Sequence, residues 1–226
     1  DFDVETSQGI VDSIYGNKKI YPQISDNLRH VGNNRDINKL TLPERRAAAE
    51  EKLQEMMKTG RVSREGLEAF KRDPAIYQRY VDALAKDTEI RMSPRAWAIA
   101  QPVTGTGKTD IYFSYSTAKN STMFRDELAR SVKIGYHPAG CDTIKSVMDH
   151  EIAHLINNSA KITSDAGIRA LYKTHLATMT SDLSTYAKKN ISEFLAEGWT
   201  EYLNNPNPRP VAKAIGDRMM QLLGGK

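Results

Sequence analysis

Apolar residues recur every three or four positions over much of this chain, which is the period of an amphipathic helix. In the first half, this pattern predicts helices over about 41–58 and in the stretches that follow Ser63 and Asp73. We therefore expect a helical segment over residues 36–95. Residues 1–35 show no sustained period and carry turn-forming residues at short intervals, so they are expected to form an irregular arm or linker.

The pattern changes from residue 96 onwards, where short β-prone runs replace the helical period. AWAIAQPV (96–103) and DIYFSYS (110–116) flank the sequence TGTGKT and predict two strands joined by a turn. A third strand is expected in VKIGYHP (132–138). GTGKT does not favour a phosphate-binding loop, because Pro102 stands where that loop has its first glycine and a strand-like run follows instead of a helix.

The clearest helix lies in TIKSVMDHEIAHLINN (143–158), with Asp142 as its expected N-cap. Further helices are predicted from residue 164 or 165, from Asn190, and over 211–223. The pattern indicates an α+β fold in which a small, mostly antiparallel sheet packs on the 143–158 helix. Apolar residues at intervals of three to four define the expected buried stripe of that helix: Ile144, Met148, Ile152 and Leu155.

Composition and charge narrow the class of protein. The net charge of +4 arises from 32 basic and 28 acidic residues without a long run of one sign, which argues against nucleic acid as a specific partner. Cys141 is the single cysteine, so no internal disulfide can form. No stretch approaches the length of an apolar membrane span, and the first ten residues are acidic where a signal peptide would be basic. The first residue is not methionine, so we expect a part of a longer protein.

The candidate chemistry begins with HEIAH at 150–154. Histidines at positions i and i+4 of a helix project from the same face, at the separation that two imidazoles need to bind one zinc ion. Glu151 can then act as the general base that takes a proton from the activated water, which is why hydrolytic zinc sites use H-E-x-x-H. The alternative is that His150 and His154 share a helical face by coincidence.

A second pair of candidates lies in NISEFLAEGWTEYL (190–203), where Glu193 and Glu197 are again four residues apart. Glu193 is our choice for a third zinc ligand. Glu197 is then the acceptor for the N–H of a ligating imidazole, which would orient that ring. The alternative is a pair of glutamates on a solvated helix face, which is common.

HEIAH and EFLAEGW, about forty residues apart, resemble the catalytic domain of anthrax lethal factor and its relatives, and also zincin metallopeptidase domains of phage head-associated proteins. The resemblance covers residues 96–220. It implies that the first helix supplies two histidine ligands and the base, and the second a glutamate ligand. It also implies that Tyr186, seven residues before Glu193, stabilises the oxyanion near the metal. Gly198-Trp199 departs from the small-aromatic pair usual in that family, at no ligand position.

The expected protein is a zinc-dependent endopeptidase, with Zn2+ as cofactor and a zincin-like domain over 96–226. An edge strand near the site would pair with an extended protein or peptide substrate. The resemblance favours a domain of a larger virion or effector protein, located in a virion or in the host cytoplasm. Two alternatives stay open: a virion-associated structural module with a non-catalytic zinc ion, and a self-processing or toxin-like effector with one target protein. His137 and His175 are expected to serve packing or solvent contact, and Asp149 a structural role.

Overall fold

The computed structural model describes residues 2–93 and 96–224 and divides into two compact units. The first unit comprises Asp1–Asn33 and Pro94–Lys226, and the second comprises Asn34–Ser93. The second unit is therefore an insertion within the first. It covers nearly the residues for which the sequence predicts a helical segment, 36–95.

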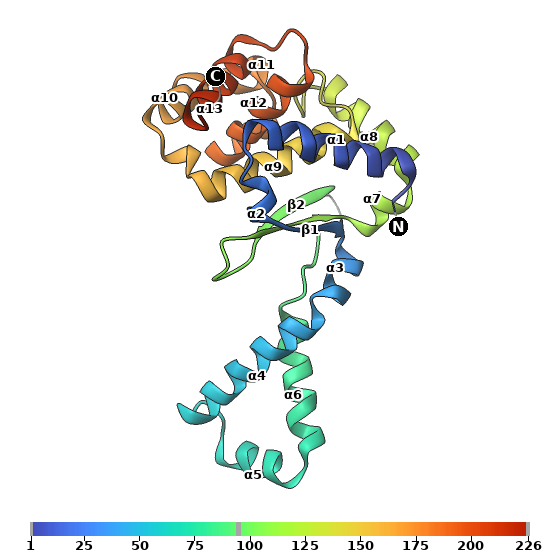
Figure 1. Cartoon of the computed structure of the whole chain (residues 1–226), viewed down its shortest axis with the longest axis vertical. Helices are drawn as coiled ribbons and strands as arrows, with labels where there is room; N and C mark the ends of the chain where they lie inside the picture. The colour runs from blue at the N-terminus through green and yellow to red at the C-terminus, as the bar shows by residue number, and fades with distance from the viewer. Residues whose placement is uncertain (1, 94–95, 225–226) are drawn as a thin grey trace. The chain divides into compact units, whose positions relative to one another are not determined.

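The first unit contains most of the helices and the whole described sheet (Figure 1). In chain order its elements are α1 (Val4–Ile20), α2 (Ile24–Asn27), β1 (Leu28–Asn33), β2 (Ala98–Pro102), β3 (Thr109–Phe113), α7 (Tyr115–Lys119), α8 (Ser121–Lys133), α9 (Ile144–Ala160), the 3₁₀ turn η1 (Ile162–Ser164), α10 (Ala166–His175), α11 (Met179–Asp182), the 3₁₀ turn η2 (Tyr186–Lys189), α12 (Ile191–Asn204) and α13 (Pro210–Leu222).

The second unit is a small helical assembly of α3 (Asn34–Leu40), α4 (Leu42–Lys58), α5 (Arg64–Arg72) and α6 (Pro74–Asp87). Its core is small, and α4 packs against α6 in it. The fully buried members of this core are Ala49, Leu53, Val81 and Ala85.

The prediction of an irregular arm or linker over 1–35 is wrong, because this stretch forms α1, α2 and β1 of the first unit. The side chain of Asp3 caps α1 by accepting a hydrogen bond from the backbone N–H of Thr6. The helix buries Thr6, Ser13 and Asn17 along with a single large apolar residue, Ile10. A helix whose buried face is mostly polar leaves no apolar period in the sequence, and this is why it was missed.

The α+β class is confirmed, but the sheet is mixed rather than mostly antiparallel. Its strands are ordered β1-β3-β2, with β1 parallel and β2 antiparallel to β3. The two strands predicted around TGTGKT are β2 and β3, and the turn between them is a hairpin loop. The parallel partner β1 comes from the stretch that shows no strand signal in the sequence.

The prediction of a third strand over 132–138 is also wrong. Helix α8 continues through Lys133, and Ile134 is its C-cap. Gly135 then adopts φ = 69°, a left-handed conformation that glycine accepts without steric cost. The chain reverses there, and residues 135–137 lead away from the helix towards the candidate site.

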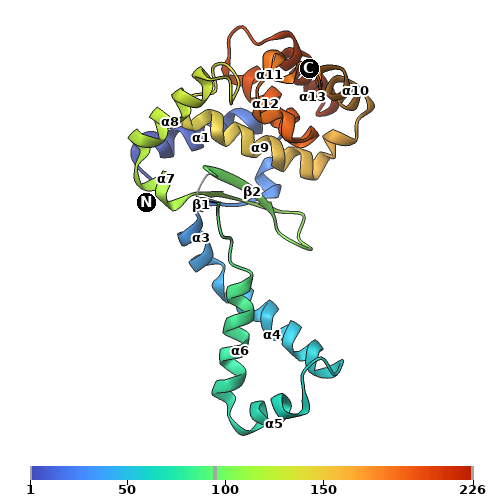
Figure 2. The same cartoon turned by 180° about the vertical axis from the view of Figure 1, so that it is seen from behind.

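Helix α9 is the central element of the first unit, and α1, α12 and β2 all pack against it (Figures 1 and 2). The four residues of its predicted stripe are all buried. Its N-cap is Thr143 rather than Asp142: the Thr143 side chain and that of Ser146 satisfy each other's backbone N–H groups in a capping box. Within the part of the chain that the structure describes, no helix is long and apolar enough to cross a membrane.

The two ends of the inserted unit leave the sheet close together. Asn33 of β1 and Ala98 of β2 both lie opposite Phe113, one on either side of β3. Because neighbouring strands are ~4.8 Å apart, the two positions are about 10 Å apart, a gap that a few residues can span.

We predict that replacing residues 34–93 by a Gly/Ser linker of about six residues leaves the first unit folded, because its core is made without them. Thermal unfolding followed by circular dichroism should show one cooperative transition. A variant that lacks a cooperative transition would contradict this, and would mean that the first unit needs the insertion.

Candidate metal centre

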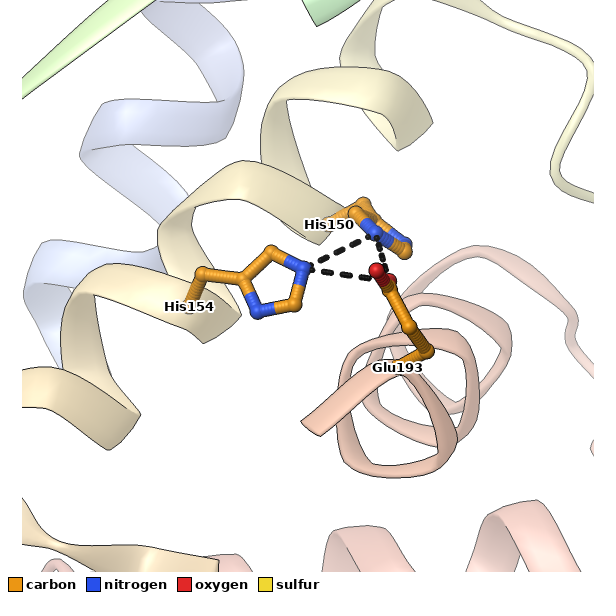
Figure 3. A group of neighbouring side chains, drawn as sticks. All are labelled: His150, His154 and Glu193. Atoms are coloured by element: carbon orange, nitrogen blue, oxygen red, sulfur yellow. Dashed lines mark hydrogen bonds and ion pairs between the residues drawn. The ribbon is translucent and has the colours of Figure 1, made fainter. Parts of the chain in front are cut away.

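Three side chains from two helices converge on one point in the first unit (Figure 3). His150 Nε2 and His154 Nε2 are 3.1 Å apart, and Glu193 Oε2 lies 3.1 Å from the first and 3.2 Å from the second. Tetrahedral zinc with bonds of about 2.0–2.1 Å holds its ligand atoms about 3.3 Å apart. The three atoms therefore already form a triangle of the size that a metal ion needs, and this group could hold one.

The packing of α9 against α12 brings these ligands together. The two histidines are one turn apart on α9, and Glu193 stands in the first turn of α12. Asn190 fixes the start of α12, because its side-chain oxygen accepts hydrogen bonds from the backbone N–H groups of Ser192 and Glu193. The three ligand side chains are 12–18% exposed, so solvent reaches them.

Glu197 lies behind His150, as the four-residue spacing from Glu193 suggested. Its Oε1 is 3.0 Å from His150 Nδ1, and its side chain is 1% exposed. The imidazole can thus donate its Nδ1–H to a buried carboxylate and present its Nε2 lone pair to a metal. Despite its burial, which raises the pKa of a carboxyl group, hydrogen bonds from His137 and His150 lower the pKa of Glu197 to about 2.

His154 has a partner of its own that sequence reasoning missed. Its Nδ1 lies 3.0 Å from the hydroxyl of Ser192, the residue before Glu193. Both imidazoles are therefore held at the nitrogen that does not face the ligand triangle. A serine beside a ligand gives no signal in sequence, because its role depends on how the two helices are rotated about their axes.

The charges of the site are strongly coupled. Burial lowers the pKa of His150, but hydrogen bonds with Glu193 and Glu197 outweigh this effect and raise it to about 10. Burial acts on Glu193 in the opposite sense, and its hydrogen bonds with His150 and His154 hold the pKa of this carboxyl well below the ordinary value. In the metal-free protein, a proton on His150 offsets part of the negative charge of the two glutamates.

Glu151 is adjacent to the triangle without belonging to it. Its side chain points between α9 and the sheet, where the backbone N–H of Ala100 in β2 donates a hydrogen bond to it. The residue is 6% exposed, and burial raises its pKa above the ordinary value for a glutamate, although His150 and His154 act against this. A carboxylate with a raised pKa beside a metal site is suited to accept a proton.

Tyr186 lies at the start of η2, with its ring centroid 5.9 Å from that of His150. Burial and the carboxylates of Glu193, Glu151 and Glu197 raise the pKa of its phenol, which therefore stays protonated and able to donate a hydrogen bond. The ammonium of Lys189 stands 3.7 Å from the ring centroid, in a cation–π contact. The structure thus places this tyrosine beside the ligand triangle.

His137, His175 and Asp149 each have a clear partner. His137 packs against aromatic rings, as expected, but its Nδ1 also lies 3.1 Å from Glu197 Oε1, a contact that the sequence did not indicate. His175 pairs with Asp182 at 2.6 Å. Asp149 is fully buried and accepts hydrogen bonds that join α1, α9 and α12, which is the structural role expected of it. The donors are Ser13, Asn17, Lys145 and Asn204.

Comparison with known proteins adds no family to these observations. No protein-family model and no curated protein matches the sequence, and no solved structure matches the fold. Function is therefore inferred from the geometry of the site and from the sequence motifs.

The raised pKa of His150 predicts how metal binding depends on pH. At pH 8 this imidazole carries a proton in the metal-free protein, because its pKa is about 10, and it must lose that proton to ligate a metal. Zinc binding should therefore release about one proton, and affinity should rise with pH up to about pH 10. Isothermal titration calorimetry at pH 8, in buffers of different protonation enthalpy, measures this release.

His175→Gln is the matched control, because His175 also pairs with a carboxylate but is not part of the ligand triangle. It should release the same number of protons as the wild type. A heat of binding that does not depend on the buffer would contradict the proposed protonation of His150.

Proposed function

We propose that this chain is a zinc-dependent endopeptidase. The observation that carries the proposal is the triangle formed by His150, His154 and Glu193, with Glu151 directly beside it. Two imidazole nitrogens and one carboxylate oxygen are a ligand set typical of catalytic zinc sites, which keep one position for water or substrate. A purely structural zinc site has four protein ligands as a rule, whereas the group found here offers three.

The roles of the protein groups follow from their positions. A bound zinc ion supplies a positive charge that lowers the pKa of water towards neutrality and polarises a carbonyl group. Glu151 accepts the proton of the attacking water and passes it to the nitrogen of the leaving amine. Tyr186, kept protonated by its surroundings, donates a hydrogen bond to the oxygen on which negative charge develops.

The substrate we propose is an extended segment of a protein or peptide. Strand β2 is an edge strand that pairs with β3 on one side only. The carbonyl of Trp97 accepts a hydrogen bond from Ser114, so in this antiparallel ladder the backbone groups of Ala98 and Ala100 face the free edge. That edge lies beside Glu151, which accepts the N–H of Ala100, so an extended peptide would pair with the remaining backbone groups of the edge and bring a carbonyl group to the water beside the base.

The setting of this activity is proposed from the sequence motifs alone. Their resemblance to lethal factor and to phage-associated metallopeptidase domains supports a role in a virion or in a toxin-like effector, either as part of a larger protein or in its processing. The competing proposal, a structural module with a non-catalytic zinc ion, gives Glu151 no function. Yet Glu151 is buried and its pKa is raised, which costs stability, and a role as general base accounts for that cost.

We predict that Glu151→Gln lowers kcat/KM by about 10²- to 10⁴-fold, the usual contribution of a general base, while zinc binding is unchanged. Hydrolysis of an unfolded protein such as denatured casein, or of a quenched fluorescent peptide library, measures the activity. Elemental analysis measures zinc in the same samples.

Glu127→Gln, on the exposed face of α8, is the matched control and should behave as the wild type. Zinc-loaded wild-type protein whose Glu151→Gln variant retains full activity would contradict the peptidase mechanism and favour the structural module.

A further inference from the structure

A histidine that belongs to neither motif reaches the candidate site from a separate segment. His137 follows the turn after α8, and its Nδ1 lies 3.1 Å from Glu197 Oε1, the same oxygen that lies 3.0 Å from His150 Nδ1. Ser184 donates its hydroxyl hydrogen to the other oxygen, Oε2, at 2.7 Å. Both oxygens of the Glu197 carboxylate thus have a partner in addition to the imidazole of His150.

His137 is itself fixed in place by its surroundings. Its ring lies 5.1 Å from that of Trp97 and 5.0 Å from that of Tyr186, measured between centroids, with both partners tilted against it. The side chain is 15% exposed. Packing between two aromatic rings restricts the rotation of the imidazole, so its Nδ1 stays directed at Glu197.

The backbone around His137 is tied to the segment that carries Tyr186. The N–H of Thr185 donates to the carbonyl of Gly135, and the N–H of Tyr186 donates to the carbonyl of Tyr136, each at 3.0 Å. The hydroxyl of Ser184 also accepts a hydrogen bond from the N–H of Ala187 in η2. The loop after α8, η2 and Glu197 therefore form one connected network.

We propose that His137 is a positioning residue for the metal centre, which acts by holding the Glu197 carboxylate in the orientation that His150 requires. This inference rests on the proposed zinc site and adds to it a third segment of the chain. A carboxylate that accepts one hydrogen bond on a given oxygen can still rotate about its side-chain bonds. Two further donors, from His137 and Ser184, remove that freedom and so keep the lone pair of His150 Nε2 directed at the metal.

Two substitutions separate the hydrogen bond from the ring packing. His137→Phe keeps an aromatic ring between Trp97 and Tyr186 but removes the donor. His137→Asn removes the ring but can place an N–H donor near the position of Nδ1. His175→Phe is the control, because it removes a histidine–carboxylate pair outside the ligand triangle.

The dissociation constant for zinc, measured by competition with a chromophoric chelator, is the main readout. Loss of groups that orient a metal ligand costs 10- to 100-fold in affinity, and we expect about tenfold for His137→Phe, because it acts through Glu197. His137→Asn should remain within about threefold of the wild type, and His175→Phe should be unchanged. Should His137→Phe not fold, His137→Leu also lacks the donor, and the same loss is expected.

Wild-type affinity in a folded His137→Phe or His137→Leu protein would overturn the inference while leaving the proposed zinc site intact. An equal loss in His137→Asn and His137→Phe would also overturn it, because a donor near the position of Nδ1 would then not preserve the affinity for zinc. Folded wild-type protein that binds no zinc would overturn the proposed function and, with it, the role of His137.

Discussion

Helices α9 and α12 pack against each other across a buried apolar interface, and this contact sets the distance between the imidazoles of one helix and the carboxylates of the other. Residues 194–201 of α12 are all buried, so the helix is covered on every side. Gly198 shows how close that packing is: a Cβ atom there would lie 2.3 Å from Ile215 Cδ1 of α13. The three potential ligand atoms meet because α12 has little freedom to move.

Buried polar groups then fix α9 in rotation as well as position. Asp149 accepts hydrogen bonds that link α9 to α1 and α12, and the indole of Trp199 donates to Asn17 within the same network. His150, which follows Asp149 in α9, is paired through its Nδ1 with Glu197 of α12. Since a buried carboxylate left without partners costs several kcal/mol, each of these networks favours one arrangement of the helices over others. The polar contacts of α1 thus help to fix the helix that carries His150 and His154.

The parts of this site that the sequence predicted are those that depend on one helix at a time. Spacing places His150 and His154 on one face of α9, and Glu193 and Glu197 on one face of α12, because the helical period is local. Nothing in the periodicity says that the two helices meet; that expectation came from the need of a zinc site for a third ligand and from the resemblance of the motifs. His137 and Ser192 were missed as partners because a single polar residue in a loop or helix end carries no local signal.

The predictions about the fold that proved wrong failed for a similar reason. Helix α1 buries Ser13 and Asn17 against Asp149, so its inner face looks like surface in the sequence. Val132 is β-prone but lies within α8, where the burial of Phe124 and Leu128 outweighs its weak local preference. The parallel pairing of β1 with β3 joins residues about eighty positions apart, and no short-range pattern reports such a register.

The zinc content of purified wild-type protein and of Glu193→Ala tests the proposed metal centre most directly, with circular dichroism to confirm that both proteins are folded. Glu193 would supply one of the three ligands, so about one zinc ion per chain is expected in the wild type and much less in the variant. A folded wild type that takes up no zinc when zinc is supplied would contradict the proposed metal centre. So would a Glu193→Ala variant that retains the full amount of zinc.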